Sequence, residues 1–396
     1  MNKKIAQSIA LMGFPAMFIA GFSVQAATIS TSTNFSYSTT TNPNPVKDTT
    51  STGGAVSASS ISAGSLTVGN ALARFDSSMG VLTGVSFDLT SDQTLSVDGS
   101  VKRSSSTGNA SISGTSSSAA QVRTGSNSSI DTGITSTTFN ANGLDALSAS
   151  ASTSASSTAK SLSASDTFAS NSNQTIASSK LNNFVGSGSL SVGSGSSNAV
   201  RLTWSPSALS AQLTGSNLIS SNATSTLSWS GTAGFTYTYL LHSLASFNSG
   251  SSASNELTLD FGNVTKGSSV SPFDFSLFNL SGDRTGLDFM GISGTGGTST
   301  LTTNLPTGFS NLGAGDFLSY AAFLDTSSVG SFAATYILHF RDTLGTGASS
   351  SQRSGQTLTL NLLGTVVAPV PVPPALWLFG SAIAAMGIIG RRRGQV

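Results

Sequence analysis

The stretch Phe235-Thr236-Tyr237-Thr238-Tyr239-Leu240 decides the fold. Its aromatic and apolar side chains alternate with threonines, so the two sets face opposite sides of an extended chain. Aromatic and β-branched residues also suit the pleated surface of a sheet. The stretch therefore predicts a half-buried strand, and it defines a pattern that recurs along most of the sequence.

Weaker forms of this alternation extend upstream of that strand. Val81 to Leu89 alternates in the same way, and Asp76 to Gly80 precedes it as a turn in which Gly80 is free to take a positive φ. Residues 145–180 are rich in serine and alanine and fit either a frayed loop or a set of weak strands. We expect one β domain over 57–243, with a Ser/Ala-rich insertion near 145–180.

Three motifs in this region carry a resemblance to the choice-of-anchor E domain family. They are Arg74 to Val85, Phe184 to Leu190, and Phe235 to Tyr239. The family pairs such domains with alternative anchoring signals. The resemblance implies a β-rich surface domain with no known chemistry.

A second β region follows a predicted linker at 244–255. About seven apolar, alternating segments separated by Gly/Ser/Thr turns lie within 256–367. Their spacing predicts an immunoglobulin-like sandwich, so the fold expected for the whole chain is all-β with two sandwich-like domains. This region also resembles the ASH-type sandwich of choice-of-anchor D proteins. The resemblance rests on five short segments: Leu259 to Val264 with Gly267, Phe278 to Leu280, Leu312 to Gly315, Gly330 to Phe332 and Tyr336 to Leu338.

The first 26 residues have the three parts of a secretory signal peptide. Lys3 and Lys4 precede an apolar run, and Val24 and Ala26 occupy the two positions that a signal peptidase reads. We expect cleavage after Ala26, and a poorly ordered leader over 27–56, where Thr, Ser, Asn and Pro dominate.

The C-terminus has the order of a sorting signal over 370–396. An apolar run at 375–390 predicts a single transmembrane helix, and the arginines that follow it keep the chain end in the cytoplasm. The proposed processing motif is Val370, Pro371, Val372, Pro373, Pro374 and Ala375, and the membrane stop is Arg391, Arg392 and Arg393.

This order resembles the PEP-CTERM sorting signals, most closely the VPLPA variant, although Val372 replaces the usual leucine and Pro374 is additional. The resemblance implies processing by an exosortase, a transpeptidase-like membrane enzyme. It also implies that the protein is exported, held at least transiently in the inner membrane, and then passed to the cell surface, the exopolysaccharide or the medium.

The amino-acid composition restricts the classes of partner and of protein that fit this chain. Between its two end signals the chain keeps 12 of 17 basic residues and all 16 acidic ones, which gives a formal charge of −4 and argues against nucleic acid as a partner. Charged residues form 8% of the chain and cysteines are absent, so the surface is neutral and rich in hydroxyl groups. Adhesins, sheath proteins and S-layer-like proteins have such surfaces, but low-complexity drift explains the composition equally well.

A catalytic set is hard to assemble from this sequence. The two histidines, His242 and His339, each end a β-patterned segment, and no Gly-x-Ser-x-Gly elbow or His-Glu-x-x-His motif accompanies them. The pairs Asp88/Asp92 and Asp283/Asp288 could hold calcium, but turn residues that bond their own backbone are the favoured interpretation. We therefore assign no catalytic, cofactor-binding or metal residue, and we place Trp204 and Trp229 in the core.

These observations predict a structural or interaction protein of the cell surface or extracellular matrix that is not an enzyme. A polysaccharide-binding or adhesive module is the alternative. A secreted hydrolase ranks third, because it requires one of the two histidines to lie within hydrogen-bond reach of an aspartate and an exposed serine.

Overall fold

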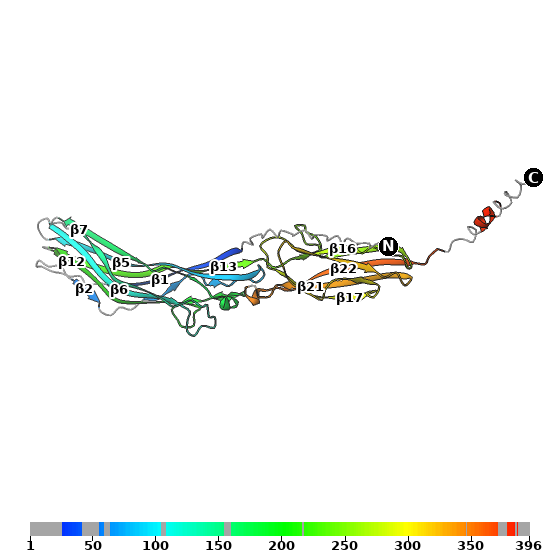
Figure 1. The fold of residues 1–396 in the computed structure, drawn as a ribbon. Helices are drawn as coiled ribbons and strands as arrows, with labels where there is room; N and C mark the ends of the chain where they lie inside the picture. Colours follow the sequence, from blue (N-terminus) through cyan, green and yellow to red (C-terminus); the bar gives the residue numbers. More distant parts are fainter. Residues whose placement is uncertain are drawn as a thin grey trace, which may run out of the picture.

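The computed structural model describes residues 26–41, 55–58, 64–103, 108–153, 160–215, 218–345, 347–370, 378–384 and 386. Strands dominate these residues, and the buried apolar side chains form two separate cores. Figure 1 shows the corresponding two β-sandwiches lying end to end. The prediction of an all-β, sandwich-like fold is confirmed.

The larger sheet of the first sandwich has the order β3-β1-β13-β5-β8, and β9 also pairs with β5. The predicted strand at 235–240 is the end of β13, which is 23 residues long and pairs with the equally long β5. At about 3.3 Å per residue, such strands extend roughly 75 Å. The members are β1 (Ala27–Thr41), β3 (Thr67–Val68), β5 (Val81–Arg103), β8 (Lys160–Ala169), β9 (Ser172–Thr175) and β13 (Leu218–Leu240).

The facing sheet has the order β11-β12-β6-β7, and β2 pairs with β12. Its members are β2 (Ala55–Ala58), β6 (Gly108–Arg123), β7 (Thr137–Thr153), β11 (Val192–Gly193) and β12 (Val200–Gly215). A short pair, β4 (Leu72–Ala73) with β10 (Ser189–Leu190), and the 3-10 helix η1 (Ser178–Phe184) cover the end nearest the second sandwich.

The interior of the first sandwich contains a buried polar layer. The fully buried Gln93 donates from Nε2 to Ser170 Oγ at 3.0 Å, and its Oε1 accepts from Ser118 at 2.6 Å and from Trp204 Nε1 at 3.2 Å. Trp229 Nε1 donates to Ser91 Oγ at 3.0 Å. Both tryptophans therefore lie in the core, as predicted, and their polar atoms are paired.

The outer face of the β1-β13-β5-β8 sheet is covered by hydroxyl side chains in register. Hydroxyl pairs face each other across strands, with oxygen separations of 3.0 Å for Ser30 and Thr236, 3.1 Å for Thr40 and Thr226, and 3.4 Å for Thr94 and Thr167. The strand register repeats such pairs along the sheet. We call this surface the hydroxyl face.

The second sandwich packs sheet β14-β16-β20-β18 on sheet β15-β22-β21-β17-β19. Its bounds are β14 (Ala245–Ser246), β15 (Glu256–Thr265), β16 (Phe273–Asn279), β17 (Leu287–Gly296), β18 (Leu301–Thr303), β19 (Phe309–Leu312), β20 (Phe317–Leu324), β21 (Gly330–Asp342), the 3-10 helix η2 (Ser349–Ser351) and β22 (Ser354–Val367). β15 runs parallel to β22, and β21 runs antiparallel to it.

Two sequence expectations need correction, and one open alternative is decided. The leader expected over 27–56 contains β1, which buries Phe35 and Tyr37 and pairs along its whole length with β13. The Ser/Ala-rich stretch at 145–180 contains the end of β7, then β8, β9 and η1, so the strand alternative holds for the residues described there. The linker expected at 244–255 contains β14, which pairs with β16 and belongs to the second sandwich.

Candidate functional site

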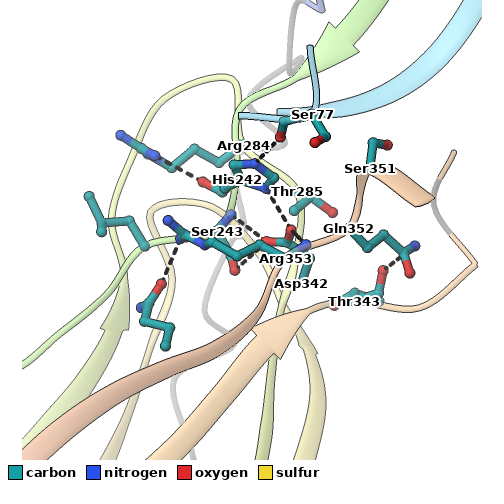
Figure 2. Close-up of polar contacts among 12 residues, drawn as sticks. Ser77, His242, Ser243, Arg284, Thr285, Asp342, Thr343, Ser351, Gln352 and Arg353 are labelled. Atoms are coloured by element: carbon teal, nitrogen blue, oxygen red, sulfur yellow. Dashed lines mark hydrogen bonds and ion pairs between the residues drawn. The ribbon is translucent and has the colours of Figure 1, made fainter. Parts of the chain in front are cut away.

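The two sandwiches meet at a polar junction, and His242 lies at its centre. Its Nδ1 is 2.7 Å from Asp342 Oδ2, and its Nε2 is 2.8 Å from the backbone oxygen of Ser77. Figure 2 shows the ring between Ser77, in the turn before β5, and Asp342, at the end of β21. Both partners are acceptors, and each ring nitrogen is within hydrogen-bond distance of one of them. The His242 ring therefore joins the first sandwich to the second.

Asp342 is the hub of the junction. Its side chain is fully buried, and it accepts from Ser243 N at 2.9 Å, from Ser243 Oγ at 2.8 Å and from Arg353 N at 2.6 Å, in addition to His242. Burial by itself raises the pKa of Asp342, but the hydrogen bonds from His242, Arg353 and Ser243 outweigh it and hold the pKa below its ordinary value. The buried carboxylate is thus stabilised by several donors.

Two arginines complete the polar network and bond mainly to backbone oxygens. Arg284 Nη1 donates to the backbone oxygen of His242 at 2.9 Å, and Arg353 Nη2 donates to the backbone oxygen of Ser243. Burial, together with the positive charge of Arg353, lowers the pKa of Arg284. These bonds fix the short connection between β13 and β14.

A loop of the second sandwich also inserts into the first. Ala348 is 2% exposed and packs in the first core, and its N–H donates to Leu82 O at 2.7 Å. Leu82 N donates in return to Ser351 Oγ at 3.0 Å, and Asn182 Oδ1 accepts from Ser350 N at 3.0 Å. We call residues 347–351 the wedge loop.

Gly347 allows the close approach of the wedge loop. Its φ is +66°, and a Cβ at this position would lie 2.1 Å from Leu82 O. Only glycine meets both conditions without strain.

A shallow cleft of about 410 Å³ opens beside His242. Its lining is polar and comes from both sandwiches: Ser77, Ser78, His242, Ser350, Ser351, Gln352 and Arg353. None of the hydrogen bonds seen in the described part of the chain joins His242 to a serine hydroxyl, because Nε2 faces the Ser77 carbonyl instead. The arrangement therefore holds a histidine and an aspartate in contact, but not the serine nucleophile that a triad needs.

His339 and Asp88 lie apart from this junction, whereas Asp283 adjoins it, because its backbone oxygen accepts from Leu241 N at 2.7 Å. His339 is exposed on β21, with Nε2 3.3 Å from Ser293 Oγ. Asp88 accepts from the Asn173 amide. Among the residues that the structure describes, no group of three potential metal ligands comes together.

Asp288 differs from the turn residue that we expected. It lies on β17, is 4% exposed, and accepts from Thr343 Oγ1 at 2.7 Å, from Asn311 N at 2.9 Å and from Arg341 Nε at 3.3 Å. Its oxygens are thus already satisfied by protein donors.

The predicted processing residues fall largely outside the described residues. Ala26 is the first residue described and Val24 lies outside. Val370 is 87% exposed at the end of the second sandwich, whereas Pro371 to Ala375 and Arg391 to Arg393 lie outside. A helical segment is described at 378–384, and no helix within the described ranges has the length and apolar character to cross a membrane.

The junction itself was missed by sequence reasoning. The sequence placed His242 at a strand end and offered it as a possible triad histidine, but it did not single out Asp342 as its partner. The available signal was weak: each follows a long alternating strand, and the two are 100 positions apart. Their meeting depends on the contact between the two sandwiches.

Comparisons with known proteins give fold neighbours alone. No protein-family model matches the chain, and no curated protein matches its sequence. Among solved structures, the chain is similar to the ASH/PapD-like domain 7 of human CEP192, with a TM-score of 0.23 and 13% identity over 28% of this chain and 82% of that one. It is also similar to WR4, a C. elegans MSP family member, with a TM-score of 0.19 and 6% identity over 26% of this chain and 92% of that one.

Proposed function

We propose that this chain is an exported structural or interaction protein of the cell surface or extracellular matrix, sorted by an exosortase-type system, and that it acts as a rigid spacer instead of as an enzyme. The observation that supports this proposal is the interlocked junction between the two sandwiches. His242, Asp342 and the wedge loop tie the two sandwiches together by contacts on both sides of a short connection. A rigid in-line pair of domains holds its two ends at a fixed separation.

The bounds of the first and last strands suit this role. β1 begins at Ala27, directly after the expected cleavage position, and β22 ends at Val367, just before the expected processing motif. If both ends are processed as the resemblance implies, most of the described residues that remain belong to the two sandwiches. The whole processed protein would then serve as the spacer.

The contacts of His242 favour this role over hydrolysis. A general base must reach the proton of its nucleophile, and here the outward ring nitrogen is 2.8 Å from a backbone carbonyl. Two serine hydroxyls of the cleft bond elsewhere: Ser350 Oγ donates to Asn182 Oδ1 at 2.9 Å, and Ser351 Oγ donates to Ala348 O at 2.7 Å.

Cell fractionation combined with intact mass measurement tests the location and processing. We expect the protein at the surface or in the medium, with a mass that begins near Ala27 and ends near Val370. A full-length, stably cytoplasmic protein would contradict the proposal.

Rigidity can be tested separately, because the chain has no native cysteine to interfere with labelling. Spin labels at Thr232→Cys on the hydroxyl face and Thr258→Cys on β15 would report the distance between the two sandwiches. We expect one narrow distance distribution. A broad distribution would rule out a rigid spacer.

Polysaccharide binding is a second candidate function, and the hydroxyl face favours it. Paired hydroxyls such as Ser30 with Thr236 and Thr94 with Thr167 present donors and acceptors at the strand spacing over several strands. A glycan array would detect this binding. Thr94→Lys on the face should abolish it and Thr258→Lys on the second sandwich should not; equal binding by both would remove this candidate.

A further inference from the structure

Two arginines face each other on the outer surface of the first sandwich, away from the junction. Arg201 of β12 is the direct cross-strand partner of Arg123 of β6, and both side chains are half-buried. Cross-strand Cα atoms are about 4.5–5.5 Å apart, and like charges placed directly opposite destabilise a sheet. The pair therefore costs stability unless something offsets its charge.

Among the residues that the structure describes, no acidic side chain forms an ion pair with either arginine. The ion pairs in the described ranges are Lys180–Asp131, His242–Asp342 and Arg341–Asp288, and neither Arg123 nor Arg201 takes part. Arg201 Nε donates to the backbone oxygen of Ser194 at 3.0 Å.

Arg123 Nε is buried and has no hydrogen-bond partner within the described part of the chain. An unpaired buried donor is unfavourable, and an arginine fork matches a carboxylate in a bidentate geometry.

The loops next to the two arginines are held together by backbone hydrogen bonds. The loops that follow β6 and precede β12 are joined by bonds from Gly125 N to Asn198 O at 3.2 Å and from Asn127 N to Ser196 O at 2.9 Å. Beside the arginines, the register places Gln121 between Thr138 and Thr203, and Gln121 Nε2 donates to Thr138 Oγ1 at 3.1 Å. The positive pair thus adjoins a row of uncharged hydroxyl and amide groups.

We propose that Arg123 and Arg201 bind a carboxylate group of an acidic polysaccharide, and that Gln121, Thr138 and Thr203 contact the hydroxyls of its sugars. The proposal rests on the extracellular location proposed above and gives its interaction role a ligand class. The carboxylate offsets the charges of the two guanidinium groups. A nucleic acid fits less well, because the rest of the exported chain is acidic.

Binding of uronate oligomers to the mature protein tests this assignment. The probes are polygalacturonate oligomers, neutral dextran oligomers of equal length, and inorganic sulfate, each titrated by calorimetry at low and at physiological salt. We expect the uronate oligomers to bind, dextran to bind at least about tenfold more weakly, and added salt to weaken the uronate complex.

A double variant and a charge-matched control separate the site from general electrostatics. Arg123→Gln with Arg201→Gln should weaken uronate binding about tenfold or more without lowering Tm, since it removes a repulsive pair. Lys102→Gln with Lys266→Gln removes the same net charge elsewhere and should leave binding unchanged. If the glutamine variant does not fold, Arg123→Lys with Arg201→Lys keeps the charge but not the fork, and should still bind more weakly.

Several results would overturn the inference. One is equal affinity for uronate oligomers in the arginine variants and in the lysine control. Another is equal affinity of the wild type for dextran and for uronate oligomers. The third is binding of sulfate without any binding of uronate oligomers. If fractionation instead shows a cytoplasmic protein while the arginine-dependent uronate binding persists, the proposed location fails and the binding site stands.

Discussion

The two sandwiches share one sheet-on-sheet plan but secure it differently. The first places polar groups in the middle of its core, where Gln93 and Ser91 satisfy the indole nitrogens of two tryptophans. The second has a core of leucines and phenylalanines, in which the ring centroids of Phe289 and Phe340 are 5.2 Å apart. Its buried polar residues gather at the junction end, with Asn279 and Asp342 both fully or almost fully buried.

The difference follows from the sequences of the strands. Along β6 of the first sandwich, small and hydroxyl residues occupy both faces, so a shift of its register by one position changes burial little. The bonds of Gln93 to Ser118 and Trp204 exist in one register alone, and they therefore specify it. The second sandwich alternates leucine and phenylalanine with polar residues, and burial alone specifies its register.

The largest expected effect is the loss of stability when a large aromatic side chain is removed from one of the two cores. Trp229→Ala removes a fully buried indole that stacks on Tyr37 at 5.8 Å, and it should lower the unfolding free energy of the first sandwich by about 3–5 kcal/mol. Phe340→Ala, its counterpart in the second core, should lower the second transition by a similar amount. Calorimetry would reveal the two transitions, and identical profiles for both variants would mean that the cores are not separate.

The junction should respond to a single methyl group. Gly347→Ala should destabilise the protein by about 3 kcal/mol, because the added Cβ collides with Leu82 O and the wedge loop must move. Gly345→Ala is the matched control: φ there is +86°, but nothing lies within 4 Å, so about 1 kcal/mol is expected. Denaturant unfolding measures both, and equal losses would show that the wedge loop contributes no packing.

The polar layer of the first core gives a smaller effect of a different kind. Gln93→Leu leaves Trp204 Nε1 and Ser118 Oγ without their partner and should cost about 2 kcal/mol. If the layer specifies register, amide exchange along β5 should also quicken in this variant. Unchanged exchange would indicate that packing alone holds the register.

The smallest effect is a pH dependence that belongs to Asp342. Because its folded-state pKa is depressed, the carboxylate contributes stability above the unfolded value of about 3.9, and this contribution is lost as the pH falls through the folded value. Asp342→Asn should be less stable than wild type by about 1–2 kcal/mol at neutral pH. The gap between them should close in acid, and a gap that stays constant down to pH 2 would contradict the depressed pKa.

Local alternation predicted the strands well where the apolar residues are large. Phe235 to Leu240 and Val81 to Leu89 are strand residues, although both strands continue far beyond these segments. β1 was missed because Phe35 and Tyr37 are its only buried aromatic residues and threonine fills most of its other inward positions. Its pairing with β13 lies about 200 residues away in the chain, which spacing cannot reveal.

The candidate site was less predictable than the fold for the same reason. His242 and Asp342 are ordinary strand-end residues until the two sandwiches dock. Arg123 and Arg201 become neighbours through the register of β6 with β12, which no local pattern encodes. Long-range register and docking therefore remain the part that a single sequence does not supply.

The position of β22 has a mechanical consequence. This strand leads out of the second sandwich toward the C-terminal segment and is paired on one flank with β15 and on the other with β21. Hydrogen bonds of an antiparallel pair lie perpendicular to the strands, so a pull along β22 loads them sideways and together instead of one after another. A tether at Val370 would transmit tension through two ladders in shear, which suits a molecule held at one end against flow.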